Sequence, residues 1–247
     1  MRLFPADATV GGILERCHVS GTRLVSADDK NYDTGAVVPT DDWRPLTPSH
    51  AELLRGATDE RRMVEVVRLP DETFAVLAEA GLGRKDIPVL PSADATYWGA
   101  MSCAGDALTT TVDPENGGLR IGLHLDNWDQ QTCADRLDSR RRLTVNLGPL
   151  SRYLLVGEFD AVTICRKLYP TDFAERYPHT DDVSAFVARG SMECLRIRID
   201  PGEGYVAPTE LLVHDGSTTG IAQSHVATST AAFWLGRIPR GVLPSAL

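Results

Sequence analysis

The centre of the chain reads Leu119-Arg120-Ile121-Gly122-Leu123-His124-Leu125-Asp126-Asn127-Trp128. Apolar residues occupy every second position from 119 to 125, which is the period of a β-strand with one buried face. On such a strand His124 and Asp126 project from the same face, one pleat repeat apart, and Gly122 leaves room beside them. That spacing lets an imidazole and a carboxylate reach the same metal ion.

Short β-rich segments separated by turns make up most of the chain after residue 86. Strands are expected at 96–104, 107–112, 119–126, 142–147, 153–156, 161–165, 194–199, 205–214 and 228–235. Strong turns lie at 113–118 and 200–204, where Asp, Pro and Gly cluster. Such a series predicts a mainly β fold with flanking helices, in the form of a double-stranded β-helix, or jelly roll.

The first part of the chain has a different character. Residues 1–45 are irregular, whereas 46–83 have helical periodicity, with one helix from Thr47 that continues through 59–67 and a second that begins at Pro70. Residues 171–189 are expected to form a helical or loop excursion. We therefore predict one domain over 1–247, with a helical and irregular N-terminal segment over 1–90 and the jelly-roll core over 91–240.

Composition narrows the class of protein. The chain has 247 residues and a formal net charge of −9, so a broad electrostatic contact with nucleic acid or anionic lipid is disfavoured. No segment approaches the run of about 18 apolar residues that a membrane helix needs, and the N-terminus lacks a signal-peptide pattern. The five cysteines are widely spaced, which is typical of reduced thiols in the cytoplasm. We expect a cytoplasmic protein with a small-molecule substrate and no nucleic-acid or membrane partner, and a homodimer is left open.

A third metal ligand would have to come from a distant strand. The chain has six histidines, and His214 ends the apolar run Leu211-Leu212-Val213 after a tight turn. His225 also precedes a β-rich run and is the competing candidate. With His124 and Asp126, either histidine would complete a set of two histidines and one carboxylate, which holds non-haem Fe(II) with coordination positions left open.

The pattern His124-x-Asp126 … His214-x-Gly216-Ser217 resembles the Fe(II)/2-oxoglutarate-dependent dioxygenases, over roughly residues 95–237. The resemblance implies that His124, Asp126 and His214 bind Fe(II), that 2-oxoglutarate chelates the iron, and that O2 is consumed as succinate and CO2 leave. Related halogenases have a small residue in place of the carboxylate. Asp126 therefore favours hydroxylation, desaturation or ring closure over halogenation.

One feature departs from the family pattern. Many members have an arginine ten to fifteen residues after the distal histidine, which clamps the far carboxylate of 2-oxoglutarate, and this chain has none there. Other relatives use a basic residue on a strand soon after the His-x-Asp strand. Arg142 is the first candidate for this clamp and Arg152 the second. Further candidates for cosubstrate binding are Asn146 and Thr228, with Thr230 as an alternative hydroxyl; those for substrate binding are Asn127 and Trp128.

Several candidate site residues also have a purely structural interpretation. His124 and Asp126 also fit a solvated strand face, His214 a turn, and Arg142 a basic surface run with its two neighbours. The resemblance, together with the compact size of the chain, implies a biosynthetic hydroxylase of a small polar molecule, such as an amino acid or an intermediate of specialised metabolism. The alternatives are a metal-dependent cupin enzyme that does not use 2-oxoglutarate and a non-enzymatic cupin-like binding module.

Overall fold

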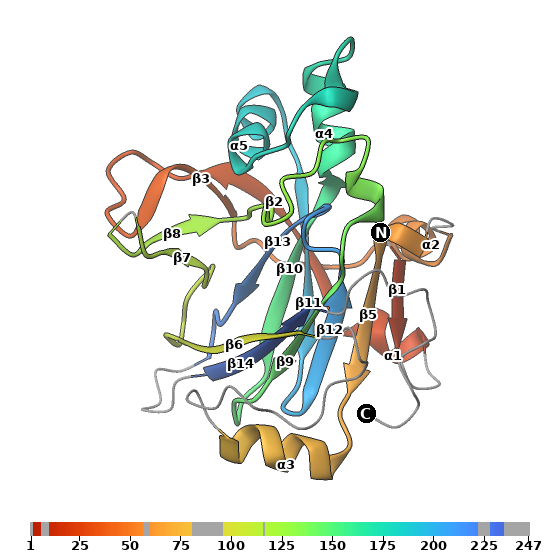
Figure 1. Ribbon diagram of the computed structural model, residues 1–247, viewed down its shortest axis with the longest axis vertical. Helices are drawn as coiled ribbons and strands as arrows, with labels where there is room; N and C mark the ends of the chain where they lie inside the picture. The colour runs from red at the N-terminus through yellow and green to blue at the C-terminus, as the bar shows by residue number, and fades with distance from the viewer. Residues whose placement is uncertain are drawn as a thin grey trace.

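The computed structural model describes residues 2–5, 10–56, 60–80, 96–115, 117–221 and 228–234. This part of the chain is mainly β and forms two sheets (Figure 1). One sheet has six strands in the order β1 (Arg2–Pro5), β5 (Met63–Arg68), β12 (Glu203–Ala207), β9 (Arg142–Asn146), β14 (Thr228–Trp234) and β6 (Thr96–Cys103). Its neighbouring strands are antiparallel except β1 and β5.

The other sheet has eight strands within the same described ranges. Its order is β13 (Leu212–Ser217), β10 (Arg152–Asp160), β11 (Glu193–Ile199), β2 (Cys17–Leu24), β3 (Tyr32–Pro39), β8 (Leu119–Gly122) and β7 (Val112–Asp113), with β4 (Arg44–Pro45) paired to β2. Strands β3 and β8 run parallel, and the other pairs are antiparallel.

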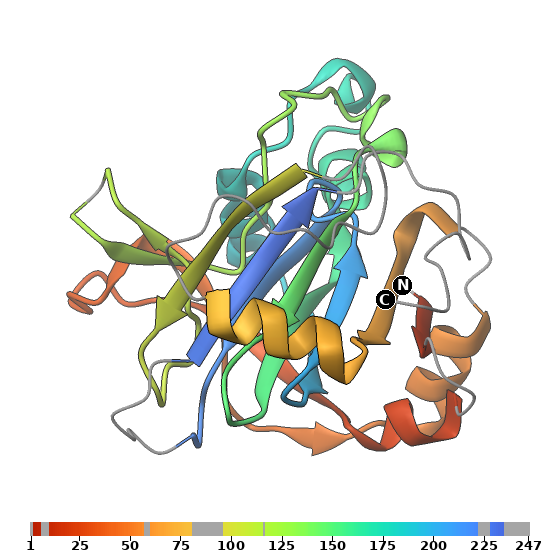
Figure 2. The same ribbon diagram turned by 60° about the horizontal axis from the view of Figure 1, so that its bottom comes forward.

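Helices lie around the two sheets. They are α1 (Val10–Glu15), α2 (Pro48–Gly56), α3 (Asp71–Ala80), α4 (Ala161–Leu168) and α5 (Thr180–Arg189), with 3-10 turns η1 (Glu60–Arg62), η3 (Arg136–Asp138) and η4 (Phe173–Glu175). Figure 2 shows α3 in front of the six-stranded sheet, where a Cβ on Gly202 would lie in van der Waals contact with the Phe74 ring. No helix in the described ranges is long and apolar enough to span a membrane.

Two apolar layers hold the molecule together. The first joins the two sheets: Val19 and Leu154 of the eight-stranded sheet pack in one cluster with Val66 and Tyr205 of the six-stranded sheet. The second lies on the other face of the eight-stranded sheet, beneath α4 and α5, and contains Leu155, Val213, Ile164 and Val183. Each buried aliphatic side chain stabilises the fold by about 1.5–3 kcal/mol relative to exposure.

Several predicted elements are wrong, each for a local physical reason. The expected strand over 161–165 is the helix α4, because Asp160 caps its N-terminus by accepting from Thr163 N at 2.7 Å. The expected helix over 59–67 ends as strand β5, whose Val64 and Val66 pack between the sheets. The expected strand over 107–112 is irregular up to Val112, because the backbone N–H groups of Thr110 and Thr111 donate to the Asp215 side chain rather than to a neighbouring strand.

Two larger corrections concern topology. The predicted strand over 205–214 is two strands in different sheets, β12 and β13, joined by a turn in which Leu211 N donates to Pro208 O at 2.9 Å. The proposed N-terminal segment over 1–90 is not a preface to the β core, since β2, β3 and β5 are strands of the two sheets. Of the expected elements, α3 and the strands at β6, β9, β10, β11 and β14 form close to their predicted positions, and α5 lies in the expected excursion.

Candidate metal centre

The backbone around Gly122 carries His124 to its position. Gly122 has a φ of +71°, and a Cβ there would collide with the carbonyl oxygen of Val37. The glycine is therefore required for this close approach, whereas the sequence suggested that it leaves room beside the ligands. The predicted strand over 119–126 therefore ends early, at Gly122 of β8. Two residues later His124 exchanges backbone hydrogen bonds of 3.0 and 2.9 Å with His214 of β13, the edge strand of the eight-stranded sheet.

The structure brings His124, Asp126 and His214 together. One ligand atom from each lies within 4.8 Å of the others, and all three side chains are buried. The Nε2 atoms of His124 and His214 lie 3.8 and 3.9 Å from the Asp126 carboxylate. Each Nδ1 lies within hydrogen-bond distance of a backbone carbonyl, Gly122 O at 2.9 Å and Leu212 O at 3.0 Å. With Nδ1–H donating to these carbonyls, Nε2 is the unprotonated nitrogen of each neutral imidazole and lies on the side of the Asp126 carboxylate.

Burial and charge set the protonation of the three groups. Burial lowers the pKa of His214 to about 3, with His124 and Arg142 acting in the same direction, so its imidazole is neutral near pH 7. Burial opposes ionisation of Asp126, but Arg142 and the two histidines outweigh it and hold the pKa of that carboxyl below its usual value. The pKa of His124 is raised, because Asp215 and Asp126 outweigh the effect of burial.

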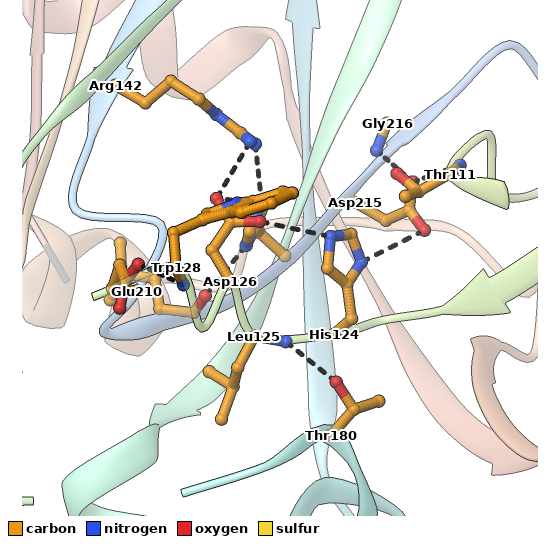
Figure 3. A network of polar contacts seen from close by, with 12 residues as sticks. Thr111, His124, Leu125, Asp126, Trp128, Arg142, Thr180, Glu210, Asp215 and Gly216 are labelled. Atoms are coloured by element: carbon orange, nitrogen blue, oxygen red, sulfur yellow. Dashed lines mark hydrogen bonds and ion pairs between the residues drawn. The ribbon is translucent and has the colours of Figure 1, made fainter. Parts of the chain in front are cut away.

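Arg142 of β9 points into the same cluster (Figure 3). Its Nη1 lies 2.9 Å from Asp126 Oδ2, and its Nη2 lies 2.8 Å from His214 Nε2. Burial lowers the pKa of its guanidinium, but the neighbouring Asp126 and Tyr205 outweigh burial and raise it. The arginine predicted from sequence as a carboxylate clamp is therefore in direct contact with the candidate ligand atoms.

The donor set fits a divalent transition metal. Two imidazole nitrogens and one carboxylate from two neighbouring backbone segments form a facial set of the kind that holds non-haem Fe(II). Asp126 Oδ2 is buried and, within the described residues, has the ion pair with Arg142 but no hydrogen bond. A buried carboxylate oxygen in this condition is suited to coordinate a cation.

Arg136, which the sequence analysis missed, holds the backbone of this centre. Its side chain is fully buried, and it donates to Asp126 O at 2.7 Å, to Pro178 O at 3.2 Å and to the Asn127 side chain. It also pairs with Glu210, itself fully buried, at 3.2 Å. One arginine thus ties the ligand loop to the turn before β13 and to the start of α5.

Glu210 is the second residue that sequence reasoning missed. Its Oε1 accepts from Trp128 N at 2.7 Å and from Asp129 N at 3.0 Å, so it holds the loop that follows Asp126. The preceding Thr209 accepts from Asp126 N at 3.2 Å through its carbonyl. The sequence signal for Glu210 was a single carboxylate directly before the apolar run 211–213. It was not recognised as a buried partner because the whole segment was predicted to be one continuous strand.

The two predicted substrate residues differ in availability. The side chain of Asn127 is engaged by Arg136 and lies 3.4 Å from His179 Nδ1. Trp128 is 57% exposed, and its backbone N–H is held by Glu210, as Figure 3 shows. Trp128 is therefore the better placed of the two to contact a molecule entering from solvent.

The remaining predicted residues lie farther along the sheets. Asn146, at the other end of β9, donates to Leu150 O and Ile199 O at 2.9 and 3.1 Å and so organises a turn. Arg152 is buried at the start of β10, with Nη2 3.4 Å from Thr110 Oγ1. The backbones of Thr228 and Thr230 pair with Cys103 and Met101 of β6, and their side chains lie outside the described residues, as does all of His225.

Comparison with known proteins adds no family assignment: no protein-family model matches the chain, and no curated protein is significantly similar to it. The chemistry of the centre therefore rests on the arrangement of its own residues.

Proposed function

We propose that this protein is an Fe(II)- and 2-oxoglutarate-dependent oxygenase with a jelly-roll core that hydroxylates a small polar molecule. The observation that carries the proposal is the convergence of His124 Nε2, His214 Nε2 and the Asp126 carboxylate within 4.8 Å. These groups come from two segments about 90 residues apart in the chain, and both imidazoles are oriented by backbone carbonyls. The arrangement leaves much of the coordination sphere to other ligands, which oxygen chemistry requires.

Each residue of the centre has a role in this proposal. Fe(II) and 2-oxoglutarate, when bound, supply the oxidising chemistry as O2 is consumed and the cosubstrate is converted to succinate and CO2. The two imidazoles and Asp126 hold the metal, and the carboxylate fills the position that a halide would need. Trp128 at the rim is proposed to contact the substrate, and the chain's task is to hold one C–H bond near the metal and keep water away.

Two arginines are candidates for the carboxylates of 2-oxoglutarate. Val156 is paired with His214 and Leu154 with Gly216, so Arg152 lies on the same face of the sheet as His214. A Cβ on Gly216 would collide with the Arg152 guanidinium, so the guanidinium lies beside Gly216. Gly216 is two residues after His214, which places the guanidinium about 7 Å along the strand from the histidine. This separation supports Arg152 as the clamp for the far carboxylate, and Arg142 as the residue that balances charge at the metal.

The decisive experiment is an anaerobic titration of the protein with Fe(II) and then 2-oxoglutarate. We expect one Fe(II) per chain and a weak visible charge-transfer band when the cosubstrate chelates the metal. Metal binding with no band at saturating 2-oxoglutarate would overturn the proposal in favour of a metal-dependent cupin enzyme without this cosubstrate. The absence of any stoichiometric metal would instead favour a binding module.

The two arginines are distinguished by replacing each with methionine. Loss of a charge-assisted clamp costs about 1.5–3 kcal/mol, so Arg152→Met is expected to weaken 2-oxoglutarate binding roughly 10- to 100-fold while Fe(II) binding is retained. The readout is the midpoint of the charge-transfer titration. Arg198→Met, which removes an arginine from the neighbouring strand in an exposed pair with Asp200, is the matched control. An unchanged midpoint in Arg152→Met, with a large shift in Arg142→Met, would assign the clamp to Arg142.

A further inference from the structure

Asp215 follows His214 in the chain and is a completely enclosed carboxylate beside the candidate metal centre. Its side chain is not exposed at all. Its Oδ1 accepts from Thr111 Oγ1 at 2.9 Å, from Thr111 N at 3.1 Å, from Thr110 N at 3.2 Å and from Gly216 N at 2.6 Å. These partners are donors, and donors around a carboxylate stabilise its negatively charged form.

The second oxygen of this carboxylate has a different environment. Oδ2 is buried and accepts no hydrogen bond within the described residues, and it lies 3.6 Å from His124 Nδ1. That separation is too long for a hydrogen bond, so the interaction is electrostatic. Figure 3 shows Asp215 on the side of the His124 ring away from Asp126. A buried oxygen left without a partner carries a free-energy cost that calls for a physical explanation.

His124 is already held by another group, so Asp215 is not needed merely to orient the ring. Its Nδ1 lies 2.9 Å from Gly122 O, and it exchanges backbone hydrogen bonds with His214. A negative charge beside Nδ1–H shifts electron density towards Nε2, which makes the imidazole a stronger metal ligand. His214 Nδ1, by contrast, lies beside the backbone carbonyl of Leu212.

We propose that Asp215 is a positioning residue of the metal centre, which acts through His124 to strengthen the binding of a divalent metal ion. The inference rests on the proposed function in requiring a metal at His124, Asp126 and His214. Asp126 supplies one negative charge inside the coordination sphere. Asp215 supplies a second negative charge outside that sphere, behind the ligand His124. The irregular segment at Thr110 and Thr111 is the support that keeps this second charge buried and oriented.

The test is the substitution Asp215→Asn, with metal affinity as the readout. Asparagine retains an oxygen that accepts from Thr110, Thr111 and Gly216, but it removes the charge and turns an N–H₂ group towards Nδ1–H. We expect the Kd for Co(II), measured anaerobically by competition with a chromophoric chelator, to rise about 10- to 100-fold, the usual effect of losing an outer-sphere partner. The d–d spectrum of bound Co(II) is expected to shift, while the stoichiometry stays at one.

Glu203→Gln is the matched control, because Glu203 is also a buried carboxylate but pairs with Arg16 at 2.8 Å away from the metal centre. Its Kd for Co(II) is expected to stay within twofold of the wild type. A wild type that binds no Co(II) or Fe(II) would overturn the proposed function. A wild type that binds one metal, with Asp215→Asn equally tight, would overturn the role of Asp215 alone.

A measurement on the wild type covers the case in which Asp215→Asn does not fold. In the Zn(II)-loaded protein, the nitrogen-correlated NMR spectrum resolves the Nδ1–H groups of His124 and His214. We expect the His124 Nδ1–H proton to resonate further downfield, because it alone has a carboxylate beside it. Equal chemical shifts for the two protons would contradict the inference.

Discussion

His214→Ala is expected to abolish stoichiometric metal binding, and with it the charge-transfer band of the iron and 2-oxoglutarate complex. Loss of an outer-sphere partner costs about 10- to 100-fold in affinity, and loss of a ligand atom costs far more because it empties a coordination position. His124→Ala should have the same result, since its Nε2 lies 3.8 Å from the Asp126 carboxylate on the other side of the cluster. Metal content after dialysis, measured by atomic emission, gives the stoichiometry.

The matched control is His50→Ala, which removes a partly exposed histidine that pairs with Glu193 at 3.0 Å. This variant should bind metal as the wild type does. Far-UV circular dichroism confirms that each variant is folded before its metal content is compared. Full metal occupancy in a folded His214→Ala protein would show that the ion binds elsewhere and would remove the basis for the proposed oxygenase.

Arg136→Met is expected to destabilise the fold by about 3–5 kcal/mol, because it removes one partner from a buried ion pair and leaves the other uncompensated. Arg136 and Glu210 are both fully buried, and the same guanidinium also donates to Asp126 O and Pro178 O. Methionine fills a similar volume without replacing any of these contacts. Chemical denaturation with urea measures the change in the free energy of unfolding.

Arg140→Met is the control, because Arg140 pairs with Asp129 at a partly exposed position. Its expected effect is about 0–1 kcal/mol, the usual range for surface ion pairs. A loss of the same small size in Arg136→Met would contradict the role given to the buried pair. The double variant Arg136→Met/Glu210→Gln should be more stable than Arg136→Met alone, because the uncompensated charge is gone.

The pH dependence of the Arg136→Met variant has a defined sign. Burial raises the pKa of Glu210 even in the wild type, where Arg136 opposes the shift. Without the arginine the folded state binds the Glu210 proton still more tightly than the unfolded state does. Stability therefore falls as pH rises through the folded pKa, and the deficit relative to the wild type should be larger at pH 8 than at pH 5.5.

Local periodicity was sufficient for part of the fold. The helix α3 and the strands at β9, β11 and β14 form near their predicted positions, because their burial pattern follows directly from residue order. The segment 161–165 shows the limit of this reasoning. Its apolar residues fit a strand as well as a helix, and only the Asp160 cap and the packing beneath α5 select the helix.

Some residues of the candidate site could likewise be predicted from local sequence, and others only from the tertiary structure. The sequence placed His124 and Asp126 close together because they are two residues apart in one short segment, but the strand from Leu119 to Asp126 that the alternation predicted ends at Gly122, where φ is +71°. The choice of His214 depended on tertiary structure, since a backbone pairing between residues 90 positions apart is decided by how the two sheets assemble. The sequence favoured His214 over His225 only because it ends an apolar run after a tight turn, which does not show which strand it pairs with.

The sequence by itself therefore determined a mainly β chain with a His-x-Asp pair and a small set of candidate partners. Only the tertiary structure placed Arg142 on the ligand atoms, Arg136 and Glu210 behind the ligand loop, and Asp215 behind His124. The physical reason is that buried charges are tolerated only where distant segments supply partners for them. Those partners are chosen by packing in three dimensions, which the order of residues along one strand does not encode.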